Sequence, residues 1–266
     1  SQISSVLFVI VVVLLTLEYL ARRNQRFHEK SSGQNTMAEQ DTSTFGKFLC
    51  LVICLIPLIL GFIIPVGILL NFVLKGFAVI NFHEIFLTTF SSITLSFVAA
   101  ILVMIISVLM IVVASYKSNT TQRIIIFLAS CGYAFPGTIL AVGIVVFVGW
   151  LNDLIHFHIS YFVGGFMVLM SAYTIRFLAV GNGAIRSGVL RIHPNLMDAS
   201  RTMGAGFFTS LRKIIIPLIY TNILVGGILV FVDILKELPI TLLLRPFNFE
   251  TLATYVYQYA SDEMLE

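Results

Sequence analysis

Residues 85–115 read IFLTTFSSITLSFVAAILVMIISVLMIVVAS, a stretch without one charged side chain. An α-helix needs about 20 apolar residues to cross roughly 30 Å of hydrocarbon, so this stretch predicts a membrane span. The whole chain has the same character: 58% of its 266 residues are hydrophobic and 11% are charged, whereas a soluble domain has about 25% charged residues. The composition excludes a water-soluble globule and predicts an all-α, polytopic bundle of transmembrane helices.

Six uncharged or nearly uncharged runs predict six spans. These runs are Ile3–Leu17, Phe48–Leu74, Ile85–Ser115, Ile124–Leu151, Tyr161–Ile175 and Ile214–Val232. A tilt or a kink absorbs the extra length of runs above about 25 residues. In the fourth run, Gly132, Pro136 and Gly137 predict a helix break, because proline lacks the N–H that a helical turn needs.

The basic residues predict the orientation of these spans. If residues 21–47 are cytoplasmic, thirteen of the 16 Lys and Arg residues fall on the cytoplasmic side, Arg176 among them. Such an excess of basic residues marks the inner side of a membrane. Asp233, Lys236 and Glu237 then form an i, i+3, i+4 cluster at the outer end of the sixth span. Anchoring at the interface and an outer gate or docking point both remain open for this cluster.

A polar stretch with SSGQNTMAEQDTST at its centre divides the chain into modules. We expect residues 1–20 to form the last helix of an upstream membrane module and residues 21–47 to form a cytoplasmic linker. Residues 48–266 then form a second module of five spans, with a cytoplasmic loop over 181–213.

The most informative stretch of that loop is RIHPNLMDASRTMGAGFFTSLRKIIIPLI, residues 191–219. Pro194 and Asn195 are good helix-start residues, and Gly204 and Gly206 are good helix stops. The sequence therefore predicts a short cytoplasmic helix of about nine residues between them.

One narrow stripe follows this short helix. Leu196, Ala199, Ser200 and Met203 fall at i, i+3, i+4 and i+7, with Asp198 beside them. A stripe that is apolar at its ends and small in its middle suits docking into a groove on another protein. An amphipathic helix lying on the membrane surface explains the same pattern equally well.

The loop also resembles a known motif. Asp198-Ala199-Ser200, then Gly204, then Ile214, Ile216 and Pro217 is similar to the EAA loop of ABC transporter permeases, whose pattern is Glu-Ala-Ala, Gly, Ile-x-Leu-Pro. All spacings agree, while Asp, Ser and Ile replace the family's Glu, second Ala and Leu. GYAFPGTILAVG (132–143) and DILKELPITLLLRPFNFETLATYVY (233–257) look like the ferric-iron type of permease, in which two membrane modules are fused in one chain.

The resemblance implies a MetI-like permease of a bacterial inner membrane, with residues 48–266 as the second permease module and a final helix after residue 266. Such a permease is not an enzyme and binds no cofactor, because a separate dimer of ABC ATPase subunits binds ATP and Mg and hydrolyses the ATP. An extracytoplasmic substrate-binding protein delivers the solute. The resemblance assigns contact with the ATPase to Asp198, Ala199, Ser200, Met203 and Gly204, and it makes Ile214, Ile216 and Pro217 the link to the sixth span.

We expect an ATP-driven importer of iron(III), with specificity in the external binding protein. Thiamine, phosphonate or polyamine uptake remains open, as does an ion-coupled secondary carrier. No metal site is expected in the spans, which lack clustered carboxylates and histidines. His156 and His158 are ordinary loop residues in this interpretation, and Tyr255, Tyr257 and Tyr259 are interfacial aromatics. The net charge of +3 does not indicate a nucleic-acid partner.

Overall fold

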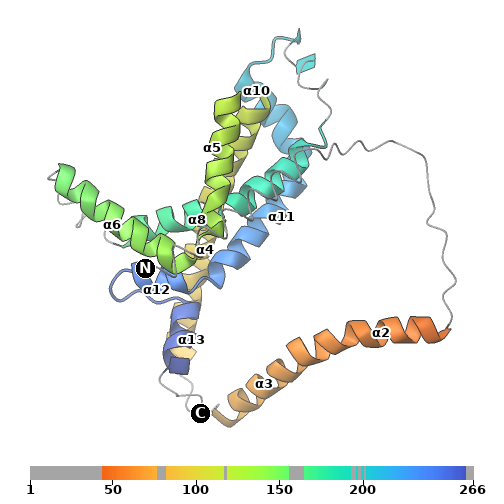
Figure 1. The fold of residues 1–266 in the computed structure, drawn as a ribbon, viewed down its shortest axis with the longest axis vertical. Coiled ribbons are helices and arrows are strands. Elements are labelled where there is room, and N and C mark those ends of the chain that lie inside the picture. Colours follow the sequence, from red (N-terminus) through yellow and green to blue (C-terminus); the bar gives the residue numbers. More distant parts are fainter. Residues whose placement is uncertain are drawn as a thin grey trace. The chain divides into compact units, whose positions relative to one another are not determined.

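A computed structural model describes residues 44–76, 82–116, 119–155, 165–192, 196, 199–200 and 202–261, and every regular element in these ranges is helical (Figure 1). The elements are α2 (Thr44–Leu58), η1 (Ile59–Ile63), α3 (Ile64–Gly76), α4 (Phe82–Tyr116), α5 (Thr120–Cys131), η3 (Gly132–Ala134), α6 (Gly137–Ile155), α8 (Phe166–Val189), α10 (Phe207–Ser210), η4 (Leu211–Ile215), α11 (Ile216–Leu235), α12 (Pro239–Leu244) and α13 (Leu252–Ser261). The all-α prediction is confirmed.

Five helical stretches of the described residues are long and apolar enough to cross a membrane. They are Phe48–Lys75, Phe82–Ser115, Gly137–Leu154, Phe166–Val189 and Phe207–Leu235. The predicted first span, the linker up to residue 43 and the two loop histidines lie outside the described residues, and the last four residues of the predicted linker, 44–47, belong to α2. The prediction of one span over residues 124–151 is wrong, because the chain leaves the α-helix at η3 and only α6 is long enough to cross.

The fifth predicted run is longer than expected. Hydropathy alone ends it at Ile175, but α8 continues to Val189, so residues 181–189 of the predicted cytoplasmic loop belong to a helix and the irregular part of that predicted loop begins at Leu190. The buried residues of this added part are mostly small or branched: Gly181, Asn182, Ile185, Gly188 and Val189. Packing against other helices keeps this less apolar part of α8 helical.

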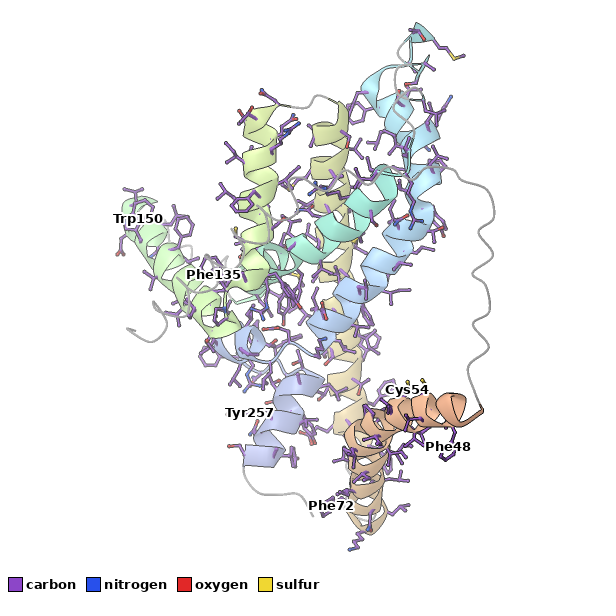
Figure 2. The ribbon with its side chains drawn as sticks, turned by 45° about the vertical axis from the view of Figure 1, so that its right-hand side comes forward. Phe48, Cys54, Phe72, Phe135, Trp150 and Tyr257 are labelled. Carbon is purple, nitrogen blue, oxygen red and sulfur yellow. The ribbon has the colours of Figure 1, made fainter. Side chains whose placement is uncertain are left out.

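The described chain divides into two compact units, which we treat separately. The smaller contains α2, η1 and α3, and none of its described side chains is buried. Phe48, Cys54 and Phe72 are examples of its outward-pointing side chains (Figure 2). A helix that is apolar all round finds its favourable surroundings in lipid or against other helices.

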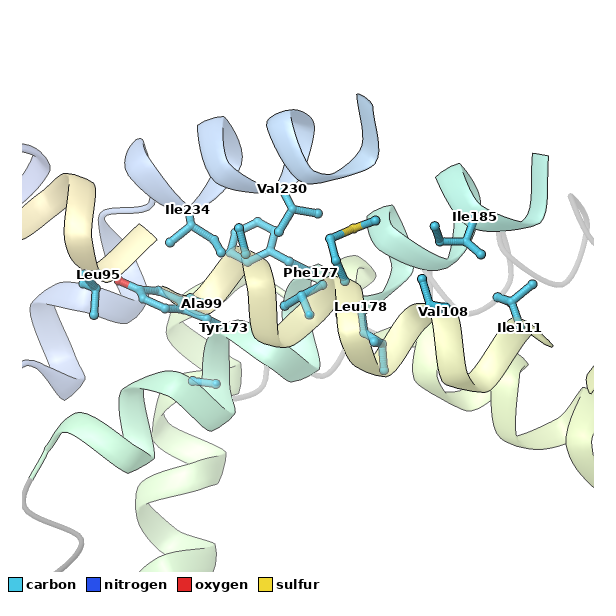
Figure 3. Packing of buried hydrophobic residues seen from close by; sticks show 14 of the residues in the cluster. Leu95, Ala99, Val108, Ile111, Tyr173, Phe177, Leu178, Ile185, Val230 and Ile234 are labelled. Atoms are coloured by element: carbon cyan, nitrogen blue, oxygen red, sulfur yellow. The ribbon is translucent and has the colours of Figure 1, made fainter. Parts of the chain in front are cut away.

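The larger unit, residues 83–261, is built around α4, α8 and α11. Leu95 and Ala99 of α4, Tyr173 and Phe177 of α8, and Val230 of α11 gather between these three helices (Figure 3). Glycines permit the close approach on which packing between membrane helices depends. A Cβ on Gly181 would overlap Ser107 of α4, and one on Gly226 would lie 2.6 Å from Cβ of Ala184.

Two π turns interrupt long helices, and both end two residues before a proline. In η1 the N–H of Ile64 donates to the carbonyl of Ile59, with Pro65 following, and in η4 the N–H of Ile216 donates to the carbonyl of Leu211, with Pro217 following. Proline has no N–H and its ring crowds the carbonyl four residues before it. The wider turn accommodates the proline without ending the helix.

Candidate functional site

The predicted cytoplasmic helix is helical at each position described before Met203, namely Leu196, Ala199, Ser200 and Thr202. The N–H of Met203 donates to the carbonyl of Ala199 at 3.1 Å, and the N–H of Ala205 donates to that of Ser200 at 3.0 Å. Between them Gly204 has φ of 77°, the left-handed conformation that commonly ends a helix and favours glycine. Asp198, Pro194 and Asn195 lie outside the described residues. We call residues 196–204 the coupling segment.

One face of the coupling segment is exposed. The exposed fraction is 86% for Met203 and 47% for Leu196, and Ala199 is exposed as well. Ser200 does not share this face, contrary to the predicted stripe: it is buried, and its Oγ lies 2.8 Å from Oγ of Ser210 in α10. A short helix that packs on its own chain must turn one side inward, and the small Ser200 lies on that side.

The coupling segment is thereby attached to a long helical stretch, because α10, η4 and α11 follow one another without a break from Phe207 to Leu235. Ile214 and Ile216 are half-buried and Pro217 is exposed in the first turn of α11. The residues that fix this stretch to the core are instead Leu211, Ile215 and Ile219, all buried. Their spacing of four residues is the signal that could have identified them from the sequence.

A second set of functional candidates surrounds the helix break at Gly132, Pro136 and Gly137. Phe135, with φ of −76° and ψ of 135°, is extended, as is usual before a proline. A Cβ on Gly132 would overlap the carbonyl oxygen of Ile175, so only glycine lets the break pack this closely on α8. After the break α6 begins at Gly137, and α5 and α6 leave it in different directions (Figures 1 and 2).

Arg176 lies beside the break. The orientation argument placed it on the cytoplasmic side, which is wrong: it lies in the middle of α8, in one of the five candidate spans. Its Nη1 donates to the carbonyl of Phe135 at 2.7 Å, and its guanidinium carbon lies 5.9 Å and 5.8 Å from the ring centroids of Tyr133 and Phe177. Guanidinium groups at this distance are attracted to aromatic faces.

The partner of Arg176 is Glu237. The distance from Nε of Arg176 to Oε2 of Glu237 is 3.4 Å, and the side chains are 18% and 9% exposed. Within the predicted cluster of Asp233, Lys236 and Glu237, the glutamate thus forms its ion pair with Arg176 of α8. Lys236 pairs with Asp233 at 2.8 Å, and this hydrogen bond raises the pKa of the exposed Lys236 ammonium. Glu237 lies in the short link between the end of α11 at Leu235 and the start of α12 at Pro239.

A chain of hydrogen bonds extends from Glu237 into the core. The hydroxyl of Thr241 donates to the backbone carbonyl of Glu237 at 2.6 Å. Since this uses the only proton of that hydroxyl, the hydroxyl of Tyr173 is the donor in its 2.6 Å contact with Thr241. Tyr173 and Thr241 are almost completely buried. The break, α8, α11 and α12 are thus joined by one polar network, which sequence reasoning missed because its members are far apart in the chain.

We expect Tyr173→Phe to lower the free energy of unfolding by about 1 kcal/mol, the usual net contribution of one buried hydrogen bond. The ring still fills the core, and Thr241 keeps its bond to Glu237. Thermal unfolding of the detergent-solubilised protein measures this effect, with Tyr220→Phe as the control, because Tyr220 is 57% exposed. Equal midpoints for the two variants would contradict a stabilising hydrogen bond between Tyr173 and Thr241.

Two tyrosines of α13 contact each other. Tyr255 donates from its hydroxyl to that of Tyr259 at 3.2 Å, and the rings lie 4.6 Å apart. Within the parts of the chain that the structure describes, no three His, Cys, Asp or Glu side chains lie close enough to hold a metal ion together.

Comparison with known proteins places the sequence that forms these sites in a family. Residues 107–260, from α4 to α13, match the binding-protein-dependent transport system inner membrane components. The chain belongs to this family. The permease is similar to the Fe(3+)-transport system permease protein FbpB 2 of Haemophilus influenzae, with 26% identity over 271 residues, 98% of the chain and 51% of the relative.

A second relative of the permease is a probable ABC transporter permease protein, y4fN, of Sinorhizobium fredii, with 28% identity over 180 residues, 67% of the chain and 31% of the relative. The permease chain thus spans about half the length of the first relative and about a third of the second. Together with the five candidate spans, the family confirms the predicted multi-pass protein of the inner membrane and the resemblance to ABC permeases of the iron-uptake type.

Proposed function

We propose that this chain is the part of an ATP-driven importer that couples ATP hydrolysis by a separate subunit to alternating access of a membrane pathway. The observation that carries the proposal is the coupling segment, with an exposed apolar face and a buried Ser200–Ser210 hydrogen bond at the start of a membrane helix. A helix of this kind fits a groove on a partner. ATP and Mg belong to that partner, a dimer of ABC ATPase subunits.

Coupling between the two proteins is reciprocal. If closure of the ATPase dimer moves the coupling segment, the state of the membrane helices must bias the ATPase by the same free energy. Gly204 sets the direction in which the chain leaves the segment, and Ile214, Ile216 and Pro217 lie in the stretch that continues into α11. These residues, together with Asp198, are our candidates for transmission between ATPase and membrane.

We further propose iron(III) as the solute, delivered by an extracytoplasmic binding protein. The Haemophilus influenzae relative is an Fe(3+)-transport system permease protein, and this likeness together with the stretch from Asp233 to Tyr257 supports iron. Thiamine, phosphonate and polyamine permeases share the architecture, so uptake of radioactive iron against each of these competitors decides the solute. If the complete transporter moves one of them and no iron, iron is excluded.

The buried Arg176–Glu237 pair favours a second candidate, an ion-coupled carrier, because ionisable groups within a membrane often belong to ion pathways. Membership of a binding-protein-dependent family argues against it. The two candidates predict different responses to energy sources. Uptake that continues after collapse of the proton gradient and stops when ATP is removed supports the ATP-driven importer, and the reverse pattern supports the carrier.

The coupling role is tested by Gly204→Trp and Asp198→Lys. We expect both variants to reach the membrane at normal abundance but to retain at least about tenfold less ATPase on co-purification, which corresponds to about 1.4 kcal/mol of binding free energy. Gly206→Ala is the matched control, because Gly206 has φ of −69° and no atom within reach of an added Cβ. Normal co-purification and normal transport in both test variants would defeat the proposal.

A further inference from the structure

We propose that the Arg176–Glu237 ion pair is a mechanical joint that transmits movement of α11 to the helix break between α5 and α6. This inference rests on the proposed function, since it requires that the coupling segment moves with an ATPase. Arg176 and Glu237 are positioning residues in this scheme.

The two ends of the helical stretch that contains α11 are attached to different partners. At the cytoplasmic end, Ser210 holds Ser200 of the coupling segment at 2.8 Å. At the other end, the N–H of Glu237 donates to the carbonyl of Ile234 at 3.0 Å, so Glu237 continues the last turn of α11. The helical stretch Phe207–Leu235 between them is about 40 Å long at 1.5 Å per residue.

Glu237 contacts the break from two directions. Arg176 bridges it to the carbonyl of Phe135. Gly137 is the first residue of α6 and has no side chain to hold α6 away from Glu237. A Cβ at this position would lie 2.7 Å from Oε1 of Glu237. A displacement of Glu237 must therefore be followed by Arg176, by the first turn of α6, or by both, because packed interiors leave no free space to absorb it.

The pairing of Arg176 with Glu237 is incomplete in this state. Among the described residues, Oε1 of Glu237 and Nε of Arg176 have no hydrogen-bond partner, although both atoms are buried. A permanent structural bridge between arginine and a carboxylate usually has two parallel, short hydrogen bonds. The carboxylate of Glu237 also has a backbone hydrogen bond with Ile240, but a contact of 3.4 Å to Arg176 leaves Oε1 and Nε unsatisfied, which favours a second arrangement in which these two atoms are paired.

The experiment uses the complete transporter, with its ATPase and binding protein, in proteoliposomes. The test variants are Glu237→Gln, which removes the charge and keeps the shape, and Arg176→Lys, which keeps the charge but cannot reach both Phe135 and Glu237 in the same way. The control is Arg245→Gln, which breaks the 3.0 Å ion pair between Arg245 and Glu250. This pair also lies next to α12, because Arg245 directly follows that helix, but its side chains are more exposed, at 28% and 34%.

The decisive quantity is the amount of solute transported per ATP hydrolysed. We expect this ratio to fall at least about fivefold in Glu237→Gln, the lower end of ordinary allosteric coupling, to fall less in Arg176→Lys, and to stay unchanged in Arg245→Gln. If the ion pair is purely structural, Glu237→Gln lowers the melting temperature, but the transporters that remain folded move the same amount of solute per ATP hydrolysed. That result would overturn the inference. An equal fall in Arg245→Gln would also overturn it.

If Glu237→Gln does not yield folded protein, Arg176→Lys decides by the same criteria. Failure of the proposed function has a different signature. In that case Gly204→Trp and Asp198→Lys would keep normal ATPase binding and normal transport, whatever the ion-pair variants do.

Discussion

Gly132→Ala is expected to destabilise the larger unit by about 3 kcal/mol or more, because overpacking a close-packed site costs about 1–3 kcal/mol even where side chains can move aside. Here the added Cβ meets backbone. It would overlap the carbonyl oxygen of Ile175 and lie 2.9 Å from its carbonyl carbon, so α8 would have to move away from the break. The yield of monodisperse protein in detergent and its melting temperature measure the effect.

Gly143→Ala is the matched control for this prediction. It introduces the same methyl group into α6, where no atom lies within 4 Å of an added Cβ. Alanine is a better helix former than glycine by about 1 kcal/mol, so Gly143→Ala should be neutral or slightly stabilising. If Gly132→Ala melts at the same temperature as Gly143→Ala, the close packing of the break on α8 is wrong.

Met203→Asp is expected to weaken binding of the ATPase subunit at least about thirtyfold, or ~2 kcal/mol. Met203 is the most exposed residue on the apolar face of the coupling segment. If that face docks into a groove, a carboxylate in its place loses its hydration without gaining a partner. Titration of the ATPase subunit onto the solubilised permease measures the change.

Two controls separate docking from general electrostatics. Thr202→Asp places the same charge one residue earlier, at an exposed position away from the Leu196–Met203 face, and should weaken binding much less. Met203→Leu keeps the apolar surface and should bind nearly as well as the native chain. Equal affinities for Met203→Asp and Thr202→Asp would mean that this face does not bind the ATPase.

The sequence contains enough information to predict the class of fold and the place of the coupling segment. Long apolar runs without charges specify membrane helices, and the glycine at position 204 marks the end of a short helix because few other residues adopt its conformation. These are local signals. They depend on composition and on spacings of a few residues, which can be seen in a single chain.

The errors come from contacts between distant residues. A hydropathy run stops at its first charge and therefore ends a span at Arg176, although the charge of Arg176 is compensated by Glu237 from the link between α11 and α12. Helical spacing assigns Ser200 to the same stripe as Leu196, Ala199 and Met203. Spacing does not show that Ser210 covers Ser200 in the folded chain. In both cases the partner lies in a different element, and only the packed structure identifies it.

The π turn at η4 affects the angular alignment of buried residues along the helical stretch that follows the coupling segment. In a regular α-helix, residues eight apart are rotated by about 80° relative to each other. Leu211, Ile215 and Ile219 nevertheless all point into the core. Because a π turn winds through a smaller angle per residue than an α-turn, η4 reduces this drift between Leu211 and Ile215 and brings the three successive anchors closer to one line along the helix, so that an axial movement is carried with less rotation of the anchored face.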